Sequence, residues 1–341
     1  MNTRPLGEAV SPPPAVPGQP GKLADPPAEV ADRPAGEPPR SSRPRPHEIL
    51  WAGYFALTGL FVLAFGSPTS DWLPVLGAHA ACVALLLIGL PRLPERGAWR
   101  VVRDWVLVAV FPLAYWEVAL LNDLFTAGYY DREVLWLEGA LFRSQPSVVL
   151  RRMLPWRPLS EYLHFGYFAY YALGPALAVP LYVRGRVAAF RYVLTVTFAV
   201  FFVCYVCFIL FPVAGPWYVF ARPSAESMGW VFPRLEHALL EQAASQGAAF
   251  PSSHAAAAVV IWLLAWRLDR RIFRLLSPVV PALVVGTVYG GFHYAVDALA
   301  GVLVAVAGYL AGPRIQRALG GELPPEYGGP NASRVSGPRG G

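Results

Sequence analysis

The sequence predicts an all-α, polytopic membrane protein built as a bundle of about eight spanning helices. Of its 341 residues, 55% are hydrophobic and 15% are charged, whereas a typical soluble domain has about 25% charged residues. From Glu48 to Pro313, long uncharged apolar runs alternate with short arginine-rich connectors. This pattern excludes a soluble two-domain enzyme.

Eight apolar runs approach the ~20 residues that a helix needs to cross the hydrocarbon layer. They are 49–66, 72–90, 104–121, 161–183, 189–212, 254–268, 276–291 and 294–312. We expect the first two to be additional spans within 47–103, and the other six to form a catalytic core over 104–312. The long segments 122–160 and 213–253 do not span, and 133–142 is predicted to be a short amphipathic helix at the membrane interface.

The two ends of the chain have a different composition. Thirteen of the 35 prolines lie in residues 1–46, and residues 313–341 are rich in glycine and proline. Such segments bury too little apolar surface to fold. We therefore predict disordered tails over 1–46 and 313–341.

The distribution of arginine predicts the orientation in the membrane. The connectors 91–103, 184–191 and 267–274 hold eleven arginines, whereas segment 213–253 holds two. Positive connectors stay in the cytoplasm, so both termini are expected there and both long segments on the outer face of a plasma membrane. The arginine- and alanine-rich composition suggests a bacterial inner membrane. Because most arginines flank apolar runs, the net charge of +6 does not indicate a nucleic-acid partner.

Two histidines are predicted to meet on that outer face. His254 opens the sixth span and His293 precedes the eighth, 39 residues later. The chain between them crosses the membrane and returns, which brings both imidazoles to the same side. Asp297 lies four residues after His293, where its carboxylate can accept a hydrogen bond from that imidazole. These three residues are the predicted catalytic group.

Next to them the sequence predicts an anion site. Ser252 and Ser253 stand where a helix cap is expected, and the free N–H groups of a helix start bind anions. Arg222 can add a planar, bidentate cation for a phosphate. In the predicted chemistry, His293 attacks phosphorus and forms a phosphohistidine, while His254 protonates the departing alkoxide and later activates water or an alcohol. No metal and no cofactor are expected.

At these residues the sequence resembles the type-2 phosphatidic acid phosphatase superfamily, whose motifs are K-x6-R-P, P-S-x-H and S-R-x5-H-x3-D. The second motif is complete at Pro251–His254. The first keeps Arg222 but has Gly215 in place of lysine, and the third keeps His293 and Asp297 but has Gly286 and Thr287 in place of serine and arginine. In phosphatase members of the family, the missing lysine and arginine help to hold a dianionic phosphate.

With these departures and with Pro216-Trp217-Tyr218, the sequence is similar to the inositol phosphorylceramide synthase branch of the superfamily. The resemblance implies a transferase that moves a phosphoinositol-like head group from a phospholipid to a lipid alcohol, which would be its partners. A lipid phosphate phosphatase acting on phosphatidate or a polyprenyl diphosphate is the alternative. A third possibility is a non-catalytic protein, either a transporter or a structural membrane protein. The sequence shows no inverted repeat, which is the feature that would support a transporter.

Further polar residues are candidates for contact with the substrate. Asp123, Asp131 and Glu138 could bind a polyol head group or lie in a solvated loop. Trp217 and Tyr218 could contact substrate or belong to an aromatic belt at the interface. His164 lies near the outer end of the fourth span, among tyrosines that could likewise contact substrate or belong to the aromatic belt.

Overall fold

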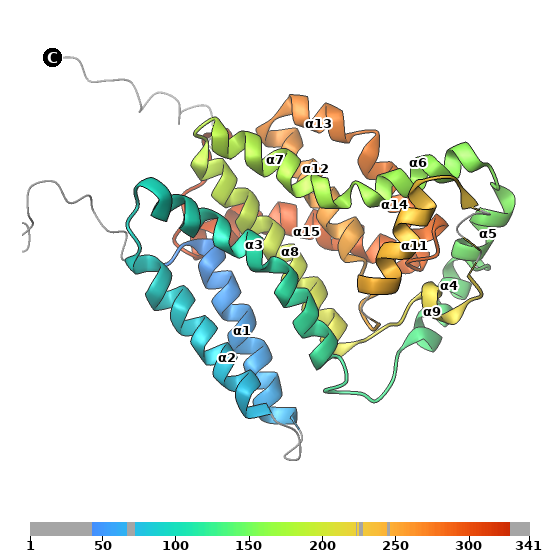
Figure 1. The fold of residues 1–341 in the computed structure, drawn as a ribbon, viewed down its shortest axis with the longest axis horizontal. Coiled ribbons are helices and arrows are strands. Elements are labelled where there is room, and N and C mark those ends of the chain that lie inside the picture. Colours follow the sequence, from blue (N-terminus) through green and yellow to red (C-terminus); the bar gives the residue numbers. More distant parts are fainter. Residues whose placement is uncertain (1–42, 67–71, 223, 225–227, 244–245, 328–341) are drawn as a thin grey trace, which may run out of the picture. The chain divides into compact units, whose positions relative to one another are not determined.

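The computed structural model describes residues 43–66, 72–222, 224, 228–243 and 246–327, and these form an all-α bundle (Figure 1). Six helical segments within them are long and apolar enough to cross a membrane. They are α1 (Pro46–Phe65), α2 (Trp72–Ala84) with its extension to Arg92, α3 (Gly97–Leu121), α8 (Val187–Leu210), α13 (Arg270–Leu276) with α14 (Val279–Tyr289), and α15 (Ala295–Ala318). The predicted helical membrane bundle is thereby confirmed.

Two of the eight predicted spans are shorter than expected. The run 161–183 is divided into α6 (Arg157–Phe168) and α7 (Tyr170–Val183), and the sixth run forms α12 (Ser253–Leu268). Both α7 and α12 are apolar but have fewer than 18 residues. Because α12 is buried along most of its length, protein rather than lipid surrounds it.

The boundaries predicted for the tails are wrong at both ends. The helix α15 continues to Ala318, and the segment after it ends in a 3-10 turn at Pro325–Tyr327. Tyr327 packs its ring on Tyr192 of α8, with centroids 4.8 Å apart, so this segment is anchored to the bundle. At the other end, Arg45 is buried. Residues 1–42 and 328–341 lie outside the described residues.

The helix α8 is the centre of the bundle, because α1, α3, α7, α12 and α15 all pack against it. Its contact with the N-terminal helices is aromatic. Trp51 of α1 lies edge-on to Phe198 and Phe202 of α8, with ring centroids 5.5 Å and 5.4 Å apart, and to Phe111 of α3 at 6.1 Å. The N-terminal helices therefore share one hydrophobic core with the rest of the chain.

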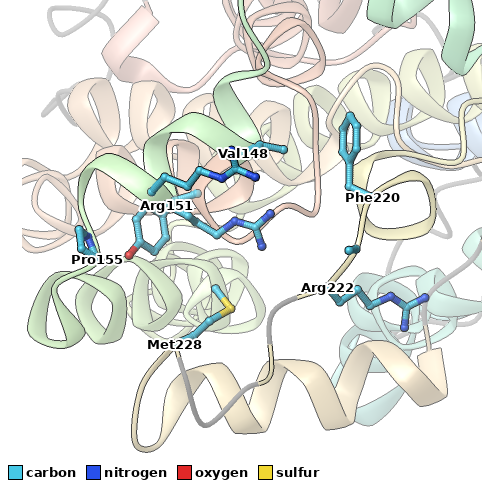
Figure 2. A pocket seen from close by; sticks show the side chains of 9 residues that line it. Val148, Arg151, Pro155, Phe220, Arg222 and Met228 are labelled. Carbon is cyan, nitrogen blue, oxygen red and sulfur yellow. The ribbon is translucent and has the colours of Figure 1, made fainter.

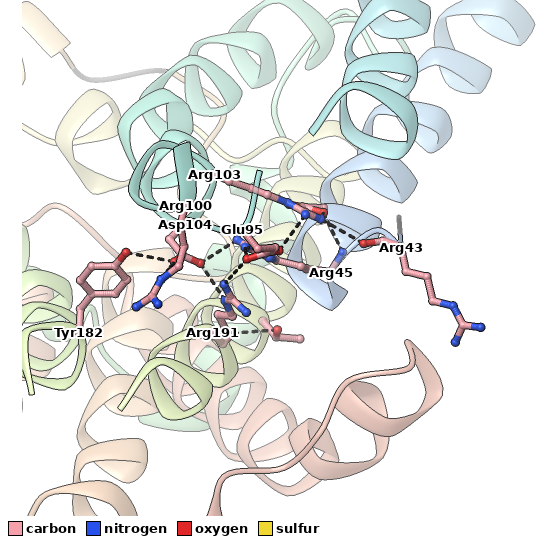
Figure 3. Close-up of polar contacts among 10 residues, drawn as sticks. Arg43, Arg45, Glu95, Arg100, Arg103, Asp104, Tyr182 and Arg191 are labelled. Carbon is pink, nitrogen blue, oxygen red and sulfur yellow. Dashed lines mark hydrogen bonds and ion pairs between the residues drawn. The ribbon is translucent and has the colours of Figure 1, made fainter. Parts of the chain in front are cut away.

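One end of the bundle carries a buried network of ion pairs (Figure 3). Its main members are Arg45, Glu48, Glu95, Arg103, Asp104 and Arg191. Arg191 lies 2.7 Å from Asp104, and Arg184 lies 2.6 Å from Asp269. These pairs join the three arginine-rich connectors, so all three lie at the same end of the bundle, as the predicted topology requires.

Four short helices gather at the opposite end of α8. They are α4 (Asp131–Phe142), α5 (Pro146–Met153), α9 (Pro216–Val219) and α11 (Phe232–Ala243). Figure 1 shows them on one side of the bundle, next to α6 and α14. The predicted helix over 133–142 is confirmed by α4. This end also holds the starts of α12 and α15, where the two predicted histidines lie.

Candidate active site

Three chain segments that are distant in sequence join at this end through backbone hydrogen bonds. Val213 accepts from the N–H of Ala249 at 3.0 Å and donates to the carbonyl of Gly247 at 3.2 Å. The N–H of Ser252 donates to the carbonyl of Asp297 at 2.9 Å. The segments carrying the three predicted motifs are thus fixed to one another by their own backbones.

A close helix crossing sets the position of the two histidines. A Cβ atom on Gly301 of α15 would lie 2.3 Å from the carbonyl oxygen of Ser252 and 3.2 Å from Cβ of Ala255. Only glycine lets the two helix starts approach so closely. The rings of His254 and His293 consequently lie side by side, with centroids 5.7 Å apart and planes inclined at 57°.

The orientation of His293 is set by a backbone carbonyl. Its Nδ1 lies 2.9 Å from the carbonyl oxygen of Ala249. Because a carbonyl can only accept, Nδ1 carries the proton and Nε2 keeps its lone pair. The N–H groups of Phe292 and His293 both donate to the carbonyl of Thr287 at 3.0 Å, which fixes the turn that presents the ring.

Asp297 differs from the expectation in one respect. Its Oδ2 lies 3.6 Å from Nδ1 of His293, longer than a hydrogen bond, and accepts the N–H of Tyr294 at 2.8 Å. Its Oδ1 is buried and has no hydrogen-bond partner among the described residues. Asp297 therefore places a buried negative charge beside the imidazole, whereas the orienting hydrogen bond comes from Ala249.

His254 lies between aromatic rings. It stacks on Tyr167, with centroids 4.8 Å apart and planes at 22°, and contacts Tyr170 at 4.3 Å. Ser252 is the N-cap of α12, since its Oγ accepts the N–H of Ala255 at 3.3 Å. Ser253 follows as the first helical residue and lines the same pocket as both histidines. The cap predicted from the sequence is therefore present.

The two histidines open into one pocket of about 250 Å³, here called the histidine pocket. Its walls come from α3, α6, α7, α8, α9, α11, the start of α12 and the loops around the two histidines. Most of them are apolar or aromatic side chains, including Phe111, Tyr115, Tyr170, Tyr205, Trp217, Tyr218, Leu240 and Phe292. No arginine, lysine or carboxylate side chain is among its described lining residues.

Asp131 and Glu138 of α4 have a role that sequence reasoning missed. Asp131 accepts the N–H groups of Ala214 and Gly215 and the hydroxyl of Tyr294, at 2.8–2.9 Å. Its oxygens are thus occupied by protein donors, so the interpretation as a polyol ligand or a solvated loop residue is not supported. Asp123, by contrast, is exposed.

Glu138 caps the helix that follows His293. Its two oxygens each accept, at 3.1 Å, an N–H from the first turn of α15, one from Ala295 and one from Val296. Burial raises the pKa of Glu138, against the effect of these two hydrogen bonds. The sequence does contain a signal for this shared role. Asp131 and Glu138 lie seven residues apart, which places both carboxylates on one face of an amphipathic helix.

The remaining predicted contacts lie at different distances from the histidine pocket. Trp217 and Tyr218 line it, but Arg222 does not. The guanidinium of Arg222 lies over the Trp217 ring, 4.5 Å from its centroid, and its Nε donates to the Trp217 carbonyl at 2.8 Å. The expectation that Arg222 reaches the reacting phosphate is therefore not met by this conformation.

His164 is buried behind the pocket and does not line it. Its Nδ1 lies 2.7 Å from the Ser160 carbonyl, and its Nε2 lies 3.9 Å from Glu236 of α11. Burial raises the pKa of Glu236 well above its usual range. These contacts make His164 a packing partner of α11, not a residue poised to contact substrate.

The departures from the family motifs have steric reasons. Gly215 has φ +92°, and a Cβ there would lie 3.0 Å from Cβ of Ala249 and 3.3 Å from the Phe292 carbonyl oxygen. A Cβ on Gly286 would lie 2.4 Å from the carbonyl oxygen of Leu163, where α14 crosses α6. Thr287 is fully buried, with its hydroxyl bonded to Val284. A side chain at Gly215 or Gly286 would therefore meet neighbouring atoms closely, and the Thr287 side chain is enclosed by protein.

The fold and the paired histidines agree with a comparison of the sequence to known families. A family model described as the PAP2 superfamily matches residues 132–311. This is more than half of the chain, and the protein belongs to that superfamily, the type-2 phosphatidic acid phosphatases. Membership supports a function of the lipid phosphatase or phosphotransferase type. No curated protein and no solved structure matches the chain significantly.

Proposed function

We propose that the protein is a lipid phosphotransferase that moves a phospho-head group, of the phosphoinositol kind, from a phospholipid to a lipid alcohol. The observation that supports this most is the pairing of His254 and His293, 5.7 Å apart, in one pocket with aromatic and apolar walls. A phosphate placed between the rings can react with one imidazole while its leaving group faces the other.

In the first step, Nε2 of His293 attacks phosphorus. The N–P bond forms, the bond between phosphorus and the diacylglycerol oxygen breaks, and His254 gives its proton to that oxygen. The head group stays on phosphorus, so the intermediate is a head-group phosphohistidine. The Ala249 carbonyl holds Nδ1–H of His293 during attack, and the buried charge of Asp297 at 3.6 Å offsets the positive charge that develops on the ring.

In the second step, the acceptor alcohol takes the place of the departed diacylglycerol. His254, now neutral, removes the proton of the alcohol as its oxygen attacks phosphorus, and the N–P bond to His293 breaks. Both histidines return to their starting state. The free N–H groups at the start of α12, which follows the Ser252 cap, are placed to stabilise charge on the phosphate oxygens.

The charge of the pocket supports a transferase over a phosphatase. A phosphate monoester carries up to two negative charges, whereas a phosphodiester carries one. The described lining of the histidine pocket holds no arginine or lysine, and Gly215 and Thr287 stand where the family motifs have these cations. A pocket with so little fixed positive charge favours the singly charged diester as donor.

The orientation follows from the two ends of α8. The ion-pair network around Arg191 lies at the start of this helix and the site at its end, ~28 Å away for a helix of this length. By the rule for positive connectors, we place the network and both termini in the cytoplasm, and the histidine pocket on the outer side of a bacterial inner membrane.

A transfer assay tests the proposal. Purified protein is incubated with phosphatidylinositol labelled in the inositol ring and with a long-chain lipid alcohol. The proposal predicts a labelled inositol phospholipid that contains the acceptor alcohol, and stoichiometric diacylglycerol. Release of inorganic phosphate from phosphatidate, with no labelled transfer product, would identify a phosphatase instead.

A further inference from the structure

A second cavity, here called the arginine cavity, shares no lining residue with the histidine pocket, and Figure 2 shows the side chains around it. It has a volume of about 680 Å³ and is lined by residues of α5, by the end of α14 and by residues 220–222. Its charged lining residues are Arg151, Arg152 and Arg222, and no acidic side chain is among its described lining residues. Three positive charges around one cavity create a strong attraction for an anion.

Arg151 is held against the turn that leads to the nucleophile. A Cβ atom on Gly291 would lie 3.4 Å from both Nη1 and Nη2 of Arg151, and His293 follows two residues later. The Nε atom donates to the Ser147 carbonyl at 3.1 Å, which fixes the side chain. Burial lowers the pKa of Arg151, but a guanidinium stays charged in proteins. Within the described chain, Arg151 and Arg152 form no ion pair.

The arginine cavity is distinct from the site of reaction. Tyr289 and Phe220 line the arginine cavity, whereas Phe292 and Trp217 line the histidine pocket. In Figure 2, Arg151 and Arg222 come from different walls, and the Arg222 side chain is turned away from Arg151. A group bound by Arg151 and Arg152 is therefore separate from the phosphate that meets the histidines.

We propose that the arginine cavity binds a phosphate group that the substrate carries in addition to the reacting phosphate. Two adjacent arginines of α5 offer planar, multiply donating groups that match phosphate oxygens. The preferred donor is then a phospholipid whose head group is itself phosphorylated, such as a phosphoinositol with a ring phosphate. This inference rests on the proposed function for the identity of the donor, but the anion site itself does not.

Direct binding tests the anion site without turnover. Isothermal titration calorimetry of the His293→Ala protein in detergent, with inorganic phosphate as probe, measures the affinity. We expect Arg151→Gln and Arg152→Gln each to weaken binding by roughly 10- to 100-fold, the range of a charge-assisted hydrogen-bonding group. Arg234→Gln, an exposed arginine of α11 that lines neither cavity, is the matched control. Phosphate affinity equal to that of the control in both variants would overturn the proposal.

Donor preference tests whether the bound phosphate belongs to the substrate. The ratio of kcat/KM for phosphatidylinositol phosphate to that for phosphatidylinositol is expected to exceed one in the parent enzyme, and to fall roughly 10- to 100-fold in Arg151→Gln. Arg151→Lys, which keeps the charge, should retain part of this preference. If Arg151→Gln leaves this ratio of kcat/KM values unchanged, the cavity does not bind a phosphate of the substrate. Equal activation of transfer from both donors by added phosphatidylglycerol would also contradict a substrate site.

The two experiments separate the two proposals. If the parent enzyme transfers no head group but the His293→Ala protein binds phosphate through Arg151, the proposed function fails and the anion site stands. If transfer occurs and neither arginine affects phosphate binding, the anion site fails and the proposed function stands.

Discussion

His293 donates its Nδ1 hydrogen to the carbonyl of Ala249 across 2.9 Å. Ala249 in turn donates its N–H to Val213, so His293 is tied to two loops that arise 80 and 44 residues earlier in the chain. A backbone carbonyl cannot be removed by mutation, and it fixes the tautomer at any pH at which the ring is neutral. The pairing explains how His293 presents Nε2 to the pocket although Asp297 is slightly too distant to hold the ring.

Replacement of His293 by alanine should abolish turnover. In the proposed reaction His293 supplies the attacking nitrogen, so we expect kcat to fall by at least about a thousandfold. Expression level and membrane insertion should stay the same, because the ring lines the histidine pocket and lies outside the apolar core around α8. The measurement is head-group transfer by purified protein matched for quantity. Turnover above a tenth of the parent level would remove His293 from the reaction.

The loss of rate caused by His254→Ala should depend on the leaving group. A general acid contributes roughly 10²- to 10⁴-fold when the departing oxygen is a poor leaving group. An activated aryl phosphodiester leaves without protonation, so its first step should be far less affected. The comparison is the burst of aryl alcohol release against diacylglycerol release from the natural donor. Equal losses for the two substrates would show that His254 does not act as the acid.

Removal of the Asp131 carboxylate should affect both stability and catalysis. Asp131→Ala leaves three buried donors without an acceptor, at a cost of about 3 kcal/mol. It also frees the loop that carries the pocket-lining residues Ala214 and Trp217. We expect a lower thermal midpoint in detergent and a reduced kcat. Asp123→Ala is the matched control, since Asp123 is exposed on the segment before α4. If both variants unfold at the parent temperature, the positioning role is wrong.

Restoring the family's lysine should damage this protein. Gly215→Lys introduces a side chain at φ +92°, with its Cβ 3.0 Å from that of Ala249, and would displace the carbonyl that holds His293. We expect loss of transfer activity and no gain of phosphatase activity on phosphatidate. Gly128→Ala, where a Cβ meets nothing within 4 Å, should behave like the parent. A Gly215→Lys protein with improved phosphatidate hydrolysis would show that the loop tolerates the cation.

The sequence predicts the parts of the site that depend on spacing along the chain. The 39 residues between His254 and His293 require a crossing and a return, and Pro251-Ser252 indicates a helix start. Whether the rings touch could not be predicted, because this depends on the crossing of α12 and α15 at Gly301. The hydrogen bond between the Ala249 carbonyl and His293 could not be predicted either, because any residue type at position 249 carries the same backbone carbonyl.

The contributions of α4 and α5 were missed for a related reason. Asp131, Glu138 and Arg151 lie in a segment that does not span the membrane, and its position beside the start of α15 and the end of α14 follows from tertiary packing. A charged residue in such a segment is solvated in most proteins, so the pattern alone favoured a loop. The predicted start of the C-terminal tail is wrong because the glycine- and proline-rich composition begins at Gly312-Pro313, whereas α15 continues through Pro313 to Ala318.

The central claim is that phosphorus becomes bonded to His293, and a trapped intermediate tests it most directly. The parent enzyme is mixed with phosphatidylinositol labelled with ³²P, in the absence of acceptor, and quenched in alkali, where phosphohistidine survives. Peptide mapping by mass spectrometry should find the inositol-phosphate group on the peptide that contains His293, and none on the same peptide of His293→Ala. A label on any other residue, or transfer that proceeds at the full rate with no labelled enzyme during turnover, would contradict this account.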